Sequence, residues 1–233
     1  MDVTASTSTG PVEPGRSVVK NIIDVFVEPS ATFKDVAERP KWLVPLIISL
    51  VVGFALSYLL LPMTVELQRL GMAEREMTPE QIDQAMGFVK FYPVIGLVIG
   101  TVFTAVFAFF FWGWATVSSA KNARYVVAFT ALTYCGFIYL LQIIAQAVVV
   151  QIKGGEEVAR EGGPPTFGLG LFLEQGEMNG LLWGLIESVN FFAIWSAVVL
   201  AIAGIYALRM SRGSATAFAV FMWVIGGLLM ALQ

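Results

Sequence analysis

Five long stretches without a charged residue constrain this chain more than any other feature. They cover Trp42–Val65, Phe91–Ala120, Tyr125–Ile152, Ser188–Leu208 and Gly213–Gln233, and each has at least 21 residues. A helix needs about 20 apolar residues to cross the hydrocarbon core of a bilayer. In lipid only helices and closed barrels satisfy their backbone, and the alternation of barrel strands is absent here. The sequence therefore predicts an all-α integral membrane protein with five transmembrane helices.

The composition supports this prediction. Hydrophobic residues make up 57% of the 233 residues and charged residues 13%, whereas soluble domains are roughly half apolar and a quarter charged. We expect spans at about 43–63, 93–117, 126–150, 189–208 and 214–232, within a membrane domain over 42–233. A disordered polar tail is expected over 1–16, followed by interfacial helices over 17–41.

The distribution of Lys and Arg predicts the orientation of the spans. The N-terminal region and the turns at 121–124 and 209–212 carry nine basic residues, and the loops at 66–90 and 153–187 carry five. Basic residues are preferentially retained on the cytoplasmic side. We therefore expect the N-terminus in the cytoplasm and the C-terminus on the opposite side.

The segment before the first span has the pattern of amphipathic helices. Apolar residues recur at helical spacing with polar ones opposite, and the apolar set is Val18, Val19, Ile22, Ile23 and Phe26, against Lys20, Asn21 and Asp24. Pro29 and Pro40 should end a first and a second short helix. We expect both helices at the inner face of the membrane.

The two loops on the other side have different characters. Thr78, Pro79 and Gln81 form a capping-box pattern that predicts a short surface helix. Glycines, prolines and acids over Gly154–Pro165 indicate a mobile segment. The apolar residues at 181–186 are too few to span and predict an interfacial lead-in to the fourth span.

Small residues recur every four positions on the first two spans. They are Ser49, Gly53 and Ser57 on the first span, and Gly96, Gly100, Thr104 and Ala108 on the second. Such ridges let helices approach closely in lipid, where packing drives association. Two readings stay open, close packing within this chain and a face for a dimer or a partner helix.

The third span carries one polar face, and one carboxylate lies beside the fourth span. The face consists of Cys135, Tyr139, Gln142 and Gln146 at steps of four, three and four. Polar groups in lipid need hydrogen-bond partners, so this face should look into the bundle, as structural glue or as the lining of a polar pathway. Glu187 lies at the outer boundary of the fourth span, where a carboxylate is usually hydrated.

Residues that catalysis or metal binding usually require are missing. The chain has no histidine and a single cysteine, Cys135, so the usual general base and metal-ligand spacings are absent. No Ser/His set or carboxylate pair is present in the spans. The sequence predicts no enzymatic activity, no cofactor and no metal, and dispersed basic residues argue against nucleic acid.

The motifs around the first span resemble a known family. Pro29-Ser30-Ala31-Thr32-Phe33, then Ala37-Glu38-Arg39-Pro40-Lys41-Trp42 and Pro45, are similar to the opening of prokaryotic Yip-domain proteins, relatives of the Ypt/Rab-interacting Yip proteins. Tyr125 to Tyr139 and Phe191, Phe192, Ile194 and Trp195 agree with the third and fourth helices of that family. The resemblance covers about residues 18 to 232.

The resemblance implies a five-helix membrane domain with a cytosolic N-terminus, here in a bacterial plasma membrane. For eukaryotic members it also implies binding to prenylated small GTPases and a part in vesicle traffic. The segment Arg39-Pro40-Lys41-Trp42-Leu43 departs from the Asp-Leu-Tyr-Gly-Pro type motif of those members. This departure argues against GTPase binding.

The charge-free bundle predicts a non-enzymatic scaffold or accessory subunit, associated with membrane organisation, trafficking or transport. Its partners would be membrane lipids, other membrane proteins or a second copy of the chain. The alternative is a transporter or channel subunit with a polar route along the third helix and Glu187.

Overall fold

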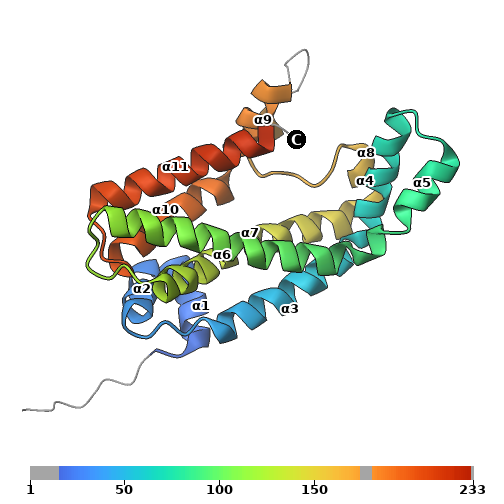
Figure 1. Ribbon diagram of the computed structural model, residues 1–233. Helices are drawn as coiled ribbons and strands as arrows, with labels where there is room; N and C mark the ends of the chain where they lie inside the picture. The colour runs from blue at the N-terminus through green and yellow to red at the C-terminus, as the bar shows by residue number, and fades with distance from the viewer. Residues whose placement is uncertain (1–15, 174–179, 232–233) are drawn as a thin grey trace, which may run out of the picture.

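The computed structural model describes residues 16–173 and 180–231, whose regular structure is helical apart from one isolated bridge between Gly168 and Asn190 (Figure 1). The α-helices are α1 (Val18–Val27), α2 (Pro29–Glu38), α3 (Leu43–Leu59), α4 (Leu61–Glu74), α5 (Pro79–Met86), α6 (Tyr92–Val117), α7 (Tyr125–Lys153), α8 (Gly155–Arg160), α9 (Gly180–Ser188), α10 (Phe191–Tyr206) and α11 (Arg212–Ala231). Two short 3-10 helices lie at Val89–Phe91 and Leu169–Phe172. The tail expected over 1–16 lies almost wholly outside the described residues.

The long helices run beside one another, most of the short ones gather at two ends, and α9 lies beside the C-terminal end of α11 (Figure 1). Helices α3, α6, α7, α10 and α11 form an elongated bundle, with α1 and α2 at one end and α4, α5 and α8 at the other. We call these the α1–α2 end and the α4–α5 end. The main core joins α1, α2, α6, α7, α10 and α11.

Within residues 16–173 and 180–231, two helices are long and apolar enough to cross a membrane. They are the continuous stretch Pro79–Val117, which includes α6, and Tyr125–Lys153, which is α7. A third crossing is added if the bent pair α3 and α4 counts as one span. Helix α10 and the stretch Arg212–Leu228 of α11 are apolar but shorter. Five crossings therefore remain a prediction, with two or three supported by helix length.

The first predicted span bends near its far end. Helix α3 ends at Leu59, and α4 continues to Glu74 at an angle of 56°. Pro62 lies in the first turn of α4, where a backbone N–H has no acceptor within the helix, so proline costs no hydrogen bond there. The chain thus turns away from the bundle axis while it remains helical. The region after residue 65 was expected to be a loop.

Helix α10 is shorter than the span expected over 189–208. The Asn190 side chain accepts a hydrogen bond of 2.8 Å from the Ala193 N–H and so caps the helix at its start. At the other end the chain turns through Arg209, whose φ is 57°. The 16 residues between extend over about 24 Å, which is less than the hydrocarbon core of a typical bilayer.

The two short helices form as predicted, and α1 buries Asn21 and Asp24 beside Val25. Asn21 and Asp24 are only 2% and 8% exposed, whereas Val19 and Val27 are 62% and 76% exposed. The polar residues find partners inside: Asn21 Nδ2 donates to Asp35 Oδ2 at 2.8 Å, and Arg16 pairs with Asp24. The burial of Asn21 and Asp24 against the bundle was not predicted from the sequence.

The turn between α6 and α7 ties the α1–α2 end together. Asn122 Nδ2 donates to the Ala37 carbonyl at 3.2 Å and to the Ala207 carbonyl at 2.8 Å. Arg124 also donates to Ala37 O, at 2.7 Å. The C-terminal ends of α2 and α10 are thus satisfied by side chains of one short basic turn.

At the α4–α5 end, the predicted capping box is confirmed, and the segment predicted to be mobile contains a short packed helix. Thr78 and Gln81 form the capping box at the start of α5, as expected. The region Gly154–Pro165 was expected to be mobile, yet it contains α8, whose Val158 and Ala159 pack with Met63 of α4 and Val150 of α7. Gly155 allows this contact, because a Cβ there would lie 3.3 Å from Met63 Cβ.

Candidate functional site

Six of the seven small residues predicted to form ridges line one cleft between α3, α6 and α7. We call it the α3–α6 cleft, and its volume is about 370 Å³. The six are Ser49, Gly53, Ser57, Gly96, Gly100 and Thr104. The seventh, Ala108, is fully buried elsewhere in the bundle.

The ridges face each other without interlocking. A Cβ at Gly53 would lie 3.7 Å from Leu97 Cδ2, an ordinary contact, and a Cβ at Gly96 or Gly100 would meet no heavy atom within 4 Å. Close packing of α3 on α6 therefore does not require glycine at 96 or 100. These glycines instead leave open space on a helix surface that is made of backbone and small side chains.

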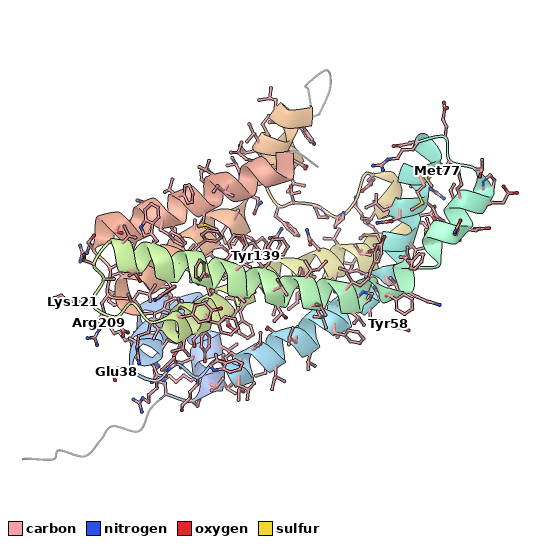
Figure 2. The ribbon with its side chains drawn as sticks, viewed as in Figure 1. Glu38, Tyr58, Met77, Lys121, Tyr139 and Arg209 are labelled. Atoms are coloured by element: carbon pink, nitrogen blue, oxygen red, sulfur yellow. The ribbon has the colours of Figure 1, made fainter. Side chains whose placement is uncertain are left out.

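A second cleft, of about 360 Å³, lies between α6, α7, α10 and α11. We call it the α6–α11 cleft. Its lining is mainly apolar, with polar groups from Thr104 of α6, Cys135 and Tyr139 of α7, Ser196 of α10 and Trp223 of α11. Thr104, Leu132, Gly136 and Tyr139 line both clefts, so the two spaces lie on either side of the contact between α6 and α7. Figure 2 shows Tyr139 near the middle of the bundle, beside α6.

The four residues of the predicted polar face are not gathered at one place. Cys135 is buried and Tyr139 is half exposed, and both line the α6–α11 cleft. Gln142 is partly buried and is not part of the lining of either cleft. Gln146 is also partly buried, and its Nε2 donates to the Pro165 carbonyl at 3.1 Å. The polar face thus follows α7 from the clefts to the loop after α8.

Glu187 lies apart from both clefts. It belongs to the last turn of α9, is partly buried and lies over Gly170, where a Cβ would come within 3.0 Å of Glu187 Oε1. Its backbone carbonyl accepts from Asn190 Nδ2 at 3.4 Å. The structure therefore does not bring Glu187 together with the polar face of α7.

Two polar residues of the α6–α11 cleft, Ser196 and Trp223, were not predicted. Ser196 is 6% exposed, and its Oγ has no hydrogen-bond partner. The buried Nε1 of Trp223 also has none. Ser196 is the only Ser or Thr between Phe191 and Leu208, which could have drawn attention to it in the sequence. Trp223 has no comparable signal, because tryptophan is common in membrane helices.

The chemistry that the two clefts support is binding. No Asp, Glu, Lys or Arg lines either of them. In the part of the chain that the structure describes, no group of three or more His, Cys, Asp and Glu side chains could hold a metal ion. Both clefts suit apolar surfaces, because each is lined by a mixture of small residues and larger apolar ones.

Comparison with known proteins gives one match. The family model described as Yip1 domain matches residues 23–233, which is nearly all of the chain and includes every residue of both clefts. No curated protein and no solved structure matches the sequence.

Proposed function

This chain belongs to the Yip1 domain family, and from that membership we propose that it acts in the membrane as a non-enzymatic scaffold or accessory subunit. Its work is to hold a transmembrane helix of another protein, or of a second copy, against α3 and α6. The proposal includes five membrane crossings, a cytoplasmic N-terminus and a location in a bacterial plasma membrane.

The α3–α6 cleft is the observation that carries the proposal. Helices associate in lipid through close van der Waals contact, which small residues at the interface permit. Here small residues from two neighbouring helices line one space, and Gly96 and Gly100 have no neighbour within 4 Å of a Cβ position. A helix that enters this space would contact both backbones at once.

The segment that departs from the motif of the eukaryotic members makes contacts within the chain. Arg39 Nε lies 3.5 Å from Asp35 Oδ1, and the Trp42 ring packs edge-on against Phe129 with centroids 5.8 Å apart. These contacts support a partner other than a GTPase. The proposed partner is instead a membrane helix.

Cysteine crosslinking in native membranes tests the proposal. The one native cysteine is buried and is replaced in Cys135→Ala. In that background, Gly96→Cys should crosslink to a second copy or to another membrane protein. Gly113→Cys is the matched control, because it lies on the same helix, is also free of neighbours within 4 Å and lies outside both clefts. If both cysteine variants were recovered only as uncrosslinked monomer, the proposal would be contradicted.

A further inference from the structure

The α6–α11 cleft contains two hydrogen-bond donors that the protein does not satisfy. Ser196 is 6% exposed, and its hydroxyl and the Trp223 Nε1 atom are both buried without a hydrogen-bond partner. The Tyr139 hydroxyl lies near that of Ser196, but the two do not meet in the geometry of a hydrogen bond. Buried polar groups in proteins are nearly always paired, so two unpaired groups in one cleft need an explanation.

The explanation must come from an occupant of the cleft. Hydrocarbon offers no water to pair with these groups, and an unpaired polar group there is costly. An indole N–H can only donate, so the occupant must present an acceptor, which in a membrane means an oxygen. The remaining lining is apolar, including Phe107, Leu200 and Met222. The occupant is therefore an apolar chain that carries an oxygen acceptor.

The shape of the cleft indicates how an occupant enters. Helices α6 and α11 meet at the α1–α2 end, where Phe111 stacks on Phe218 with ring centroids 4.8 Å apart and Trp114 Nε1 donates to Ser214 Oγ at 3.0 Å. Figure 1 shows the two helices separating toward their other ends. The cleft lies along this separation, and the outward Phe103 and Val224 beside it are exposed apolar residues. Entry is therefore sideways from the lipid.

The depth of the polar groups suits the ester region of a lipid. Ser196 lies five residues after Phe191, the first residue of α10, which corresponds to about 7 Å along the helix. An ester carbonyl at the membrane boundary can reach this depth when its acyl chain enters the cleft. The volume of about 360 Å³ lies in the range of ligand pockets, roughly 300–1,000 Å³.

We propose that the α6–α11 cleft binds one ester-linked acyl chain of a membrane phospholipid, whose carbonyl oxygen accepts hydrogen bonds from Ser196 and Trp223. This site is separate from the helix-docking role proposed for the α3–α6 cleft. Neither Ser196 nor Trp223 lines that other cleft, so the two proposals can fail independently.

Photoactivatable phospholipids test this site in the full chain. The protein is reconstituted into phosphatidylcholine vesicles that contain a phospholipid with a diazirine on its acyl chain, in an ester-linked or an ether-linked form. We expect the ester probe to label peptides of α10 and α11 at least about fivefold more than the ether probe, which lacks the carbonyl acceptor. Equal labelling by the two probes would overturn the proposed role of the carbonyl.

Variants distinguish the effect of the two hydrogen-bond donors from the effect of the cleft volume. The double variant Ser196→Ala, Trp223→Phe removes both donors but leaves the shape of the cleft nearly unchanged. It should abolish the preference for the ester probe, while labelling by the ether probe persists. Gly226→Leu, at a cleft position with no neighbour within 4 Å of a Cβ, should fill the cleft and lower both labels about fivefold. Gly113→Leu lies outside the cleft and should change neither.

Two results would overturn the proposal. The first is labelling that Gly226→Leu leaves unchanged, which would mean that the probe reacts at the outer surface of the bundle. The second is a crosslink between two copies of the chain at the cleft residues, which would identify a second protomer as the occupant. Circular dichroism and size-exclusion chromatography of each variant establish that the labelled protein is folded.

Discussion

Asn21 of α1 donates a 2.8 Å hydrogen bond to Asp35 of α2, and both side chains are buried at the α1–α2 end of the bundle. The two residues are 14 positions apart, so this bond closes the hairpin of the two helices. Thr32 adds a bond from its hydroxyl to the Asn21 carbonyl at 3.1 Å. The N-terminal hairpin is thus closed by buried polar contacts between its two helices.

Asn21→Ala should loosen this hairpin. The substitution removes the donor to Asp35 and leaves a buried carboxylate with one partner fewer, at a cost of about 1–3 kcal/mol. We expect a lower midpoint of thermal unfolding in detergent and faster proteolysis near Glu28. Lys20→Ala, at an exposed neighbouring position, is the control and should change neither. Equal behaviour of the two variants would show that the bond contributes little.

The outward face of α1 should contact lipid. Val19, Ile23 and Val27 lie four residues apart on one exposed stripe, which buries apolar area if it rests in the interfacial region. A spin label at Ile23→Cys should therefore collide with oxygen more often than with a water-soluble nickel chelate. At the neighbouring Lys20→Cys the ratio of the two collision rates should be lower. A water-exposed label at Ile23 would contradict this placement.

Gly204 should not tolerate a side chain. A Cβ at this position would lie 2.9 Å from Ala215 Cβ and 3.2 Å from Met210 Sδ, so α10 and α11 would have to separate. Gly204→Ala is expected to lower stability by about 1–3 kcal/mol through overpacking. Gly213→Ala meets no atom within 4 Å and should be neutral or slightly stabilising. Urea unfolding in detergent compares the two variants.

The two ends of the bundle should face opposite sides of the membrane. Glu38, Lys121 and Arg209 lie at one end and Met77 at the other (Figure 2). In a Cys135→Ala background, Met77→Cys should react with an impermeant maleimide added outside intact cells, and Lys121→Cys only after permeabilisation. Labelling of both without permeabilisation would contradict the predicted orientation.

Much of the fold follows from local sequence signals. The long uncharged runs predict α6 and α7 to within a few residues, because charges end them on both sides. The capping box at Thr78 is equally local. The bend between α3 and α4 was missed, because Pro62 is compatible with a helix in its first turn and the run of uncharged residues continues through it.

Features that depend on contacts between distant segments could not be predicted. Periodicity shows that α1 has two faces, but the burial of Asn21 depends on Asp35, a residue of another helix. In the same way, the small residues were predicted on each helix, but not that they line one cleft. Ser196 and Trp223 come from different helices and become a pair only through the packing of α10 and α11.

The most direct test of helix docking is the assembly state of Gly100→Leu in native nanodiscs. Leucine at Gly100 meets no atom within 4 Å of its Cβ and lies in the α3–α6 cleft, so it should block the cleft without unfolding the chain. The account predicts that the wild type and the control Gly113→Leu keep a partner or second copy, and that Gly100→Leu is recovered alone. Retention of the same assembly by Gly100→Leu would contradict it.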